Sequence, residues 1–486
     1  MKSRVSVIGL GYMGLPTAII LAENELTVFG YDIDEEKINK IKKAEPVINE
    51  PEIIPRLQSV LDDKEFSVSN KLHEAEYYII SVPTPVDKNK NANLDAVWSA
   101  TSEVAKILKH GDTVILESTS IVGTTEKLSR KLEEITNLKA GIDFFVGYSP
   151  ERAIPGNTFY EVVHNNRIIG GINKESSNKI FDLYSKFVKS EISITDSKTA
   201  EMVKLVENSS RDVQIAFSNQ VASIAYQQGI NPYDLIALAN KHPRVNILNP
   251  RCGVGGHCIA IDPWFLVEAF PEHTKLLKAA REINDAKPLE VINFVEDFAE
   301  RYVSTDSYFP TTHEVTSDKR YTMSVEALAK SDQYDRPIIS RARRSLLAES
   351  GSNSAGIVSR DERKKINLLV LGLTFKPDVD DLRESPALEI VEKLSKKENF
   401  NLTIADPNIN KSQIDKNLQK NFVDNFETGL ENADIILVLV GHREFRDFDW
   451  SFFPDKKILD FSGLNIKEAI MFQASNEATF QTKIQI

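Results

Sequence analysis

The sequence predicts an α/β protein in which two doubly wound, mostly parallel sheets are joined by a long central helix. Three observations support this fold class. Short, β-branched apolar runs alternate with longer helical patterns in the N-terminal part of the chain. One helical pattern continues from about Thr199 to Gln228, and a second alternation of strand-like and helical runs begins at Ile366. A chain of 486 residues is also too long for one hydrophobic core.

Strands are expected where apolar runs are short and bounded by turn residues. In the N-terminal part these runs are Val5–Leu10, Leu26–Tyr31, Tyr77–Val82, Thr113–Glu117 and Arg167–Ile169. Because helical stretches connect them, the strands should pair in parallel. The long helix is closed by Gly229 and Pro232. In the C-terminal part the runs are Ile366–Gly372, Leu402–Ala405, Ile435–Val440 and Ile458–Phe461.

The composition argues against several classes of protein. Hydrophobic residues make up 41% of the chain and charged residues 27%, as in ordinary globular proteins. The net charge of -12 argues against a broad nucleic-acid-binding surface. No apolar run reaches the roughly 18 residues of a membrane span, and the N-terminus leads directly into a strand pattern. We therefore expect a cytoplasmic protein without a signal peptide.

Cysteine is rare, which bounds the redox chemistry. The chain contains 2 cysteines, Cys252 and Cys258. This number suits a reducing compartment and excludes a disulfide scaffold. Neither cysteine lies in a CxxC pair or near histidines with zinc-ligand spacing, so we expect no metal site.

A glycine-rich loop follows the first expected strand. Gly9-Leu10-Gly11-Tyr12-Met13-Gly14 opens a helix, where exposed N–H groups can hold a pyrophosphate. Asp32 ends the next strand and suits the ribose hydroxyls of NAD while repelling a 2′-phosphate. The pattern therefore predicts a Rossmann-like NAD site. The alternatives are a glycine turn that binds nothing and an Asp32 that only caps the following helix.

Two further strand ends carry polar residues to the same edge of the expected sheet. Val82-Pro83-Thr84-Pro85 and Glu117-Ser118-Thr119 each follow a strand, at the carboxyl edge where such sheets bind ligands. The first of them is equally consistent with a stiff turn.

The segment from Gly253 to Trp264 is the most informative for chemistry. Glycines at 253, 255 and 256 let the backbone approach a ligand, and the Cys258 thiol follows them. Pro263 suits the first turn of a helix, with Asp262 as its N-cap. A thiol beside a helix start can have a lowered pKa and so act as a nucleophile. The alternatives are a buried core cysteine and an Asp262 that is only a cap.

The long helix carries a polar seam. Lys204, Asn208 and Arg211 are spaced by four and three residues and so share one face. Apolar neighbours flank this seam, so a lysine and an amide aimed at a buried site could stabilise an oxyanion. The alternative is an ordinary solvated helix face.

Several segments together resemble the UDP-glucose/GDP-mannose dehydrogenase family, most closely its UDP-N-acetyl-D-mannosamine branch. The matching segments are Gly9–Gly14, Ser149–Glu151, Lys204–Asn208, Gly255–Cys258 with Asp262, and Phe375–Pro377 with Asp381–Pro386. His242–Asn246 is similar to that branch, and His257 stands where UDP-glucose enzymes usually carry serine. Asn249–Cys252 departs from the glycine- and proline-rich segment expected there.

The resemblance implies a four-electron oxidation with two NAD per sugar, in polysaccharide biosynthesis. Cys258 would attack the C6 aldehyde to give a thiohemiacetal, whose oxidation yields a thioester that water hydrolyses. Lys204 and Asn208 would hold the C6 oxygen. Asp262, Thr119 and Glu151 would place or activate water, with Glu151 as the favoured base in hydrolysis. The implied cofactor-binding residues are Gly9, Gly11, Tyr12, Met13, Gly14, Asp32, Thr84, Thr119 and Arg383. The implied residues for the UDP-sugar are Glu151, Arg152, Lys204, Asn208, Arg244, Gly255, His257, Phe375 and Lys376.

The resemblance also implies the organisation of the chain. Arg244 would reach the site of a partner subunit, which predicts a homodimer through the long helix. We expect an NAD-binding domain at 1–195, a central helical and dimerisation region at 196–303, an insertion or flexible linker at 304–361, and a UDP-sugar-binding domain at 362–486.

Other functions stay open at this point. UDP-glucose, UDP-N-acetylglucosamine or UDP-N-acetylgalactosamine could be the substrate instead. A two-electron β-hydroxyacid dehydrogenase would need the helix lysine but no nucleophilic cysteine. A catalytically silent nucleotide-binding protein is the third possibility, although Lys204, Asn208, Cys258 and Asp262 together argue against it.

Overall fold

The computed structural model describes residues 2–48, 50–305, 365–454, 456–467 and 469. The chain forms two compact units that are each assembled from separate stretches. The first contains residues 1–220, 246–287 and 373–388, and the second contains the described residues of 221–245, 288–372 and 389–486. The expected insertion at 304–361 lies almost wholly outside the described residues. The domain boundaries given above stay a prediction.

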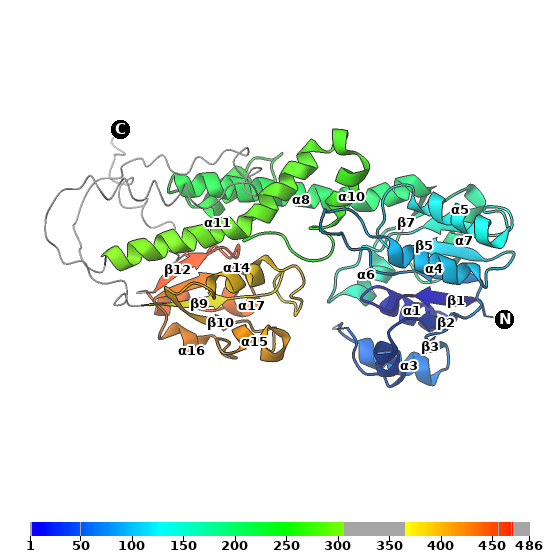
Figure 1. Ribbon diagram of the computed structural model, residues 1–486, viewed down its shortest axis with the longest axis horizontal. Helices are drawn as coiled ribbons and strands as arrows, with labels where there is room; N and C mark the ends of the chain where they lie inside the picture. The colour runs from blue at the N-terminus through cyan, green and yellow to red at the C-terminus, as the bar shows by residue number, and fades with distance from the viewer. Residues whose placement is uncertain (1, 49, 306–364, 455, 468, 470–486) are drawn as a thin grey trace. The chain divides into compact units, whose positions relative to one another are not determined.

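The first unit is built on a sheet with the strand order β3-β2-β1-β4-β5-β6-β7-β8 (Figure 1). The strands are β1 (Arg4–Ile8), β2 (Thr27–Tyr31), β3 (Phe66–Ser69), β4 (Tyr77–Ile80), β5 (Thr113–Leu116), β6 (Phe145–Tyr148), β7 (Arg167–Gly171) and β8 (Ile192–Asp196). Every neighbouring pair is parallel except β6 and β7, which are antiparallel. The predicted mostly parallel sheet is confirmed.

Helices cover both faces of this sheet, as a doubly wound fold requires. They are α1 (Gly14–Glu23), α2 (Glu35–Lys42), α3 (Ile53–Asp62), α4 (Asp95–Ala105), α5 (Thr124–Thr136), α6 (Thr158–His164) and α7 (Lys174–Tyr184). Alternate residues of β4 belong to different hydrophobic clusters. Tyr78 and Ile80 share a cluster with residues of α4 and α5, whereas Ile79 shares one with residues of α1 and α7. Both faces are therefore buried.

The predicted long helix is present as α8 (Ser197–Gln227). Asn231 caps the next helix, α9 (Pro232–Ala239), by accepting from the backbone of Tyr233 and Asp234. The segment from Gly253 to Trp264 runs into α10 (Asp262–Ala269), which is followed by the 3-10 turn η1 (Pro271–His273) and α11 (Lys275–Thr305).

The second unit contains a parallel sheet with the order β10-β9-β11-β12, which confirms the second predicted α/β pattern. Its strands are β9 (Ile366–Leu371), β10 (Phe400–Ala405), β11 (Ile435–Val438) and β12 (Lys457–Asp460). Its helices and 3-10 turns are α14 (Pro386–Leu394), η5 (Lys411–Gln413), α15 (Lys416–Gln419), α16 (Glu427–Leu430), α17 (Arg443–Arg446) and η6 (Trp450–Phe452). Leu369, Ile436 and Trp450 belong to its core.

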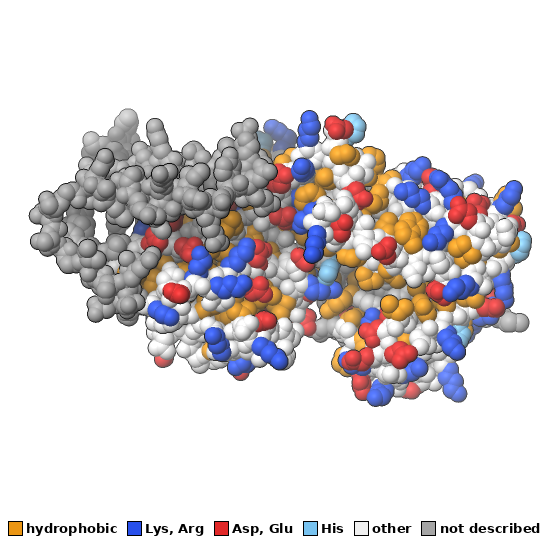
Figure 2. Space-filling view, viewed as in Figure 1, with side chains coloured by type: hydrophobic (Ala, Val, Ile, Leu, Met, Phe, Trp, Pro, Cys, Tyr) orange, Lys and Arg blue, Asp and Glu red, His pale blue; other side chains and the backbone are white. Residues whose placement is uncertain are grey.

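Charges are intermixed on the face of the molecule shown in Figure 2, where acidic and basic side chains alternate with apolar ones. No described helix is both long and apolar enough to cross a membrane.

Candidate active site

The order of the strands locates the nucleotide-binding edge. Between β1 and β4 the strand order reverses direction, because β2 and β3 lie on one side and β4 to β8 on the other (Figure 1). Ligands of doubly wound sheets bind at the carboxyl ends of the strands beside such a switch point. The glycine-rich loop follows β1, Val82–Pro85 follows β4, and Ser118-Thr119 follows β5. All three segments predicted to contact the cofactor therefore share one edge.

The glycines of the loop have different physical roles. Gly9 has a φ of 94°, and a Cβ there would lie 2.3 Å from the Ser81 carbonyl oxygen. A Cβ on Gly14 would lie 1.9 Å from the Gly9 oxygen. By contrast, a Cβ on Gly11 would meet no atom within 4 Å, and no side chain caps the start of α1. Two glycines thus form the turn, while the third leaves open backbone at a helix N-terminus, which fits a pyrophosphate.

Asp32 lies at the end of β2 and is buried. It accepts hydrogen bonds from the backbone of Leu10 (2.9 Å) and Asp34 (3.0 Å) and from Lys37 Nζ (2.9 Å). Burial alone would raise the pKa of Asp32, but these hydrogen bonds, Lys37 first, hold it below its usual value. The side chain that caps α2 is Asp34, which accepts from the Lys37 backbone. Asp32 is thus a charged acceptor and not the helix cap.

The other residues expected around the cofactor lie at the same edge. Tyr12 and Met13 are half-buried in the glycine loop, and Thr84 and Thr119 are half-buried beyond β4 and β5. Arg383 arrives from a distant part of the sequence and stacks over the Tyr12 ring at 4.6 Å. Asp381 pairs with this guanidinium.

Two glycines of the catalytic segment are explained by packing of the chain on itself. A Cβ on Gly255 would lie 2.2 Å from the Glu384 oxygen, and one on Gly256 would lie 2.8 Å from Phe375 Cε2. Gly256 also has a φ of 81° and donates a backbone hydrogen bond to Arg383. The close approach expected for a ligand is therefore made here by the Phe375–Pro386 loop. This packing brings Phe375, Lys376 and Arg383 into the unit that holds Cys258.

The environment of the Cys258 thiol differs from the expectation. Cys258 is exposed as a residue, but protein atoms crowd its sulfur, and this burial raises the pKa of the thiol. Lys204 opposes this rise most strongly, Asp262 adds to it, and Arg383 and Arg211 oppose it further. The predicted lowering by a helix start is wrong, because burial outweighs the nearby cations.

Asn208 and Asp262 are hydrogen-bonded to each other, and Lys204 and Asp262 act electrostatically on this thiol. Asn208 Nδ2 donates to Asp262 Oδ2 at 2.6 Å, and both residues are buried. Burial raises the pKa of Asp262 to about 6, although Lys204 and Asn208 lower it. The prediction that Asp262 caps its helix is wrong: it is the first residue of α10, the cap position is Ile261, and no side chain caps it. The carboxylate turns toward Asn208 instead.

Glu151 meets Lys204 through its backbone and not through its carboxylate. Lys204 Nζ donates to the Glu151 carbonyl oxygen at 2.8 Å. The Glu151 carboxylate folds back onto the amides of Arg152 (2.6 Å) and Ala153 (2.8 Å) and pairs with Arg167 (2.6 Å). Burial opposes ionisation, but Arg167 and these amides hold the pKa of Glu151 below its usual value. A carboxylate so occupied is a weak base.

The remaining expected substrate residues divide between the units. Arg152 pairs with Glu207 on α8 (2.6 Å), and His257 is exposed beside Cys258. Lys376 is half-buried, and burial followed by the charge of Arg211 lowers its pKa. Arg244 is exposed and belongs to the second unit.

Sequence reasoning missed Arg167 as a residue of this region, having used it only to mark a strand. Its guanidinium links Glu117 and Glu151, two residues that follow different strands. The sequence did contain a signal for Arg167, because a charged residue begins an apolar strand. This signal is weak as long as the direction of the strand in the sheet is unknown. Arg211 was noted on the helix face but not counted among the site residues.

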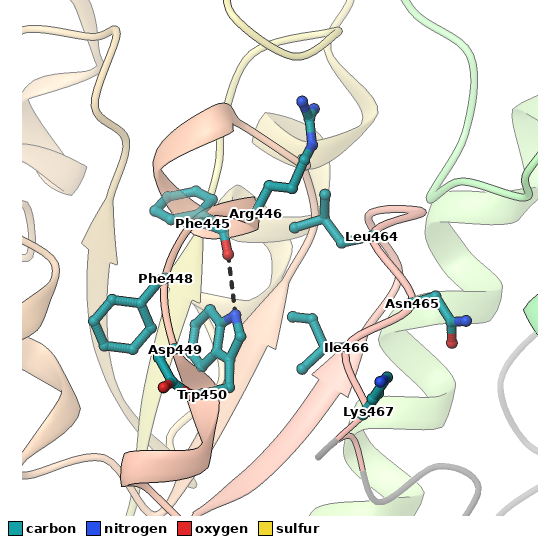
Figure 3. Close-up of a pocket in the computed structure, with 9 residues that line it drawn as sticks. All are labelled: Phe445, Arg446, Phe448, Asp449, Trp450, Leu464, Asn465, Ile466 and Lys467. Carbon is teal, nitrogen blue, oxygen red and sulfur yellow. Dashed lines mark hydrogen bonds between the residues drawn. The ribbon is translucent and has the colours of Figure 1, made fainter.

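The second unit has a separate pocket of about 200 Å³ at the ends of β11 and β12 (Figure 3). Aromatic side chains form one wall, and Trp450 Nε1 donates to the Phe445 carbonyl at 3.0 Å. None of the residues expected at the active site lines it. Among the described residues, no group of three or more His, Cys, Asp or Glu side chains could hold a metal ion.

Comparison with protein families gives three consecutive matches. The NAD binding domain of the UDP-glucose/GDP-mannose dehydrogenase family matches residues 3–188. The central domain of that family matches residues 198–286, and its UDP binding domain matches residues 369–464.

Individual proteins give the same result. The chain is 38% identical to a UDP-N-acetyl-D-mannosamine dehydrogenase of Campylobacter jejuni, over 91% of this chain and 96% of the relative. It is 35% identical to an NDP-N-acetyl-D-galactosaminuronic acid dehydrogenase of Ralstonia solanacearum, over 95% and 96%. The solved structure of a UDP-D-ManNAc dehydrogenase from Pyrococcus horikoshii is 34% identical and superposes with a TM-score of 0.76, covering 96% of this chain and 97% of that one.

Proposed function

Because the chain belongs to the UDP-glucose/GDP-mannose dehydrogenase family, we propose that it oxidises a UDP-N-acetylhexosamine at C6 to the uronic acid, with UDP-N-acetyl-D-mannosamine as the first candidate. The enzyme class, an NAD-dependent UDP-sugar dehydrogenase, follows from the family. The finer proposal concerns the sugar and the residues that act on it.

The observations that support this chemistry best are the Asn208–Asp262 hydrogen bond and the electrostatic action of Lys204 and Asp262 on the Cys258 thiol. An ammonium and an amide donor are suited to an oxygen that carries negative charge. Each such donor is typically worth about 10²–10³ in rate. A thiol at the same place adds a covalent route, which a two-electron hydroxyacid dehydrogenase would not need.

In the proposed sequence, Lys204 and Asn208 hold the C6 oxygen. Bound NAD would supply the hydride acceptor for both oxidations, and in the first of them the proton of the C6 hydroxyl leaves to solvent. After the first oxidation the Cys258 sulfur bonds to the aldehyde carbon, and the thiol proton goes to the former carbonyl oxygen, giving a thiohemiacetal. Loss of the second hydride and of the hydroxyl proton gives a thioester. Water then adds to the thioester carbon, and the C–S bond breaks to release carboxylate and thiol.

We propose Asp262, and not Glu151, as the base that activates this water. The resemblance favoured Glu151, whose carboxylate is held by Arg167 and two amides. Asp262 has a pKa raised to about 6 by burial, which is near the value that suits a general base at neutral pH. Asp262 also acts electrostatically on the Cys258 thiol, so we assign to the same carboxylate the relay of the thiol proton to the former carbonyl oxygen.

Cationic side chains beside the thiol suit a UDP-sugar. Arg211, Arg383 and Lys204 all act electrostatically on Cys258, and Arg211 acts also on Lys376. An overall charge of -12 makes such a local cluster the favourable place for a diphosphate.

We also propose that the protein is a homodimer that pairs through α8. Met202, Val206 and Phe217 on this helix are 42%, 46% and 53% exposed. With 3.6 residues per turn they fall on one stripe. An exposed apolar stripe of this kind suits a contact with a second copy. Light scattering of Phe217→Ser should give a lower mass than the unaltered protein, and an unchanged mass would contradict this contact.

The function is tested by measuring NADH formed per sugar nucleotide consumed. The panel should contain UDP-linked N-acetylmannosamine, N-acetylglucosamine, N-acetylgalactosamine and glucose, because the relatives carry different sugar names. We expect two NADH per UDP-N-acetylmannosamine. A yield of one, or a clear preference for UDP-glucose, would contradict the proposal.

A further inference from the structure

Arg167 lies at the active-site edge because one strand runs backwards. β7 is antiparallel to β6, with Gly147 opposite Gly171 and Tyr148 opposite Gly170. The first residue of β7 therefore lies at the edge where β5 and β6 end. Continuing this register places Arg167 opposite Glu151. A parallel β7 would have put Arg167 at the far edge of the sheet.

The guanidinium of Arg167 connects the two segments that follow β5 and β6. Its Nη2 donates to Glu117 Oε1 and its Nη1 donates to Glu151 Oε2, each at 2.6 Å. Its Nε donates to Ser149 Oγ at 3.1 Å, and the guanidinium lies 4.4 Å from the centre of the Tyr184 ring. All of these side chains are buried. The guanidinium is thus fixed on every side.

Stability alone does not account for this arrangement. Two buried carboxylates share one cation, and Glu117 Oε2 accepts no hydrogen bond from any described residue. Burial raises the pKa of Glu117 above its ordinary value, although Arg167 and the Tyr184 hydroxyl donate hydrogen bonds to its Oε1, so ionising this carboxyl costs the folded protein free energy. A buried charge network of this kind is more readily explained by geometry that it imposes than by energy that it contributes.

The geometry in question is that of Lys204. Its ammonium donates to the Glu151 carbonyl oxygen at 2.8 Å, and the position of that oxygen depends on how the 151–153 turn is held. The Glu151 carboxylate accepts hydrogen bonds from the backbone amides of Arg152 and Ala153, which hold the turn in its shape. Arg167, at the start of β7, donates to the same carboxylate and so fixes it relative to the sheet.

We propose that Arg167 is a positioning residue, which fixes the Glu151 carbonyl oxygen through the Glu151 carboxylate and thereby holds the Lys204 ammonium beside the Cys258 thiol. The role in turnover rests on the function proposed above. The effect on the thiol does not, because it requires no substrate. Of the charged groups that act on the thiol, Lys204 has the largest influence, followed by Asp262, Arg383 and Arg211.

The experiment compares Arg167→Lys with the unaltered full-length protein. Lysine keeps the charge but cannot donate to both carboxylates and to Ser149 at once. The first readout is the rate of Cys258 alkylation by iodoacetamide as a function of pH. Cys252 is buried, so the exposed Cys258 dominates this signal. We expect the midpoint of the curve of alkylation rate against pH to move to higher pH, because the Lys204 charge that favours the thiolate is no longer held in place. Lys204→Met marks the full extent of that movement.

The second readout is turnover. In Arg167→Lys we expect kcat to fall by roughly tenfold to a hundredfold, as a displacement of about 1 Å can cause, with a smaller change in KM. Arg56→Lys is the matched control. Arg56 also pairs with a glutamate, Glu23, and lies 4.1 Å from the centre of an aromatic ring, but at a different place in the unit. It should leave both the alkylation midpoint and kcat unchanged.

General loosening of the fold would raise alkylation at every pH without moving the midpoint, and that result would overturn the proposal. So would an unmoved midpoint with kcat within about twofold of the control. If Arg167→Lys does not fold, Glu151→Gln removes the charge through which Arg167 holds the 151–153 turn, and an unmoved midpoint there would overturn the proposal equally. A shifted midpoint in a protein that oxidises no UDP-sugar would support the positioning role while refuting the proposed function.

Discussion

Asp262→Asn should make the protein more stable and less active. Asp262 is 2% exposed, and burial raises its pKa from 3.8 to about 6. The folded protein therefore holds the Asp262 proton more tightly than the unfolded chain does. Between pH 3.8 and about 6 the folded state binds more protons, so the contribution of this group to stability falls as the pH rises through that window.

The magnitude follows from the two pKa values. A rise from 3.8 to about 6 corresponds to about 3 kcal/mol, because a tenfold change in proton affinity is worth about 1.4 kcal/mol. Asparagine has nearly the same shape, can still accept from Asn208, and does not ionise. Above pH 6 the variant should therefore be more stable than the unaltered protein by up to about 3 kcal/mol, and below pH 4 the two should agree.

The assay is thermal unfolding of both proteins from pH 4 to pH 8, with the difference between them plotted against pH. Taking the difference removes the effect of other titrating groups, such as the buried Glu117. Asp63→Asn, at an exposed site after α3, changes the net charge equally and serves as the control for that change. An Asp262→Asn protein that is less stable at pH 7.5, or whose difference is flat across this range, would refute the reasoning.

Other substitutions test single contacts of the site. Gly256→Ala should destabilise the first unit by about 1–3 kcal/mol and lower kcat, because its φ is 81° and a Cβ would lie 2.8 Å from Phe375. Chemical denaturation measures the change in stability. Gly111→Ala, with a φ of 89° and open space around the new Cβ, should show the cost of the backbone strain alone in the same assay. Cys258→Ala should lower the rate of uronic acid formation by more than about 10³-fold, whereas Cys252→Ala should leave that rate unchanged. Product analysis measures both rates, and comparable rates in the two variants would argue against a covalent route. Asp32→Ala should raise the KM for NAD by about tenfold to a hundredfold with little change in kcat. Asp34→Ala is the control, because it removes only the cap of α2. An equal rise in KM in this control would show that Asp32 is not the ribose acceptor.

Local patterns predicted the parts of the fold that depend on neighbours in the sequence. The loop from Gly9 to Gly14, the long helix and most strands of both sheets are of this kind. Three strands were missed: β3 and β8 alternate apolar with polar residues, and β6 is interrupted by Gly147. The residues of a strand do not determine whether it runs parallel or antiparallel to its neighbour, so the reversal of β7 could not be predicted from its sequence.

The chemistry of the site was less predictable than its composition. That Cys258, Lys204 and Asn208 belong together followed from the resemblance, but the state of the thiol did not. Its pKa depends on how many atoms crowd the sulfur, which a helix start in the sequence does not reveal. Likewise, Asp262 satisfied the sequence rule for a helix cap, yet the Asn208 amide from α8 took its carboxylate. Tertiary contacts determine both the pKa of the Cys258 thiol and the hydrogen-bond partner of Asp262.

The segment from 373 to 388 has a consequence for how the protein is made. It belongs to the first unit, although it is synthesised long after the other stretches of that unit. Gly255 and Gly256 pack against Phe375 and its neighbours, so during synthesis the loop that carries the thiol cannot complete its packing until residues 373–388 have left the ribosome. A nascent chain that has reached residue 287 already holds the glycine-rich loop and Cys258, but not the segment that packs on the thiol loop.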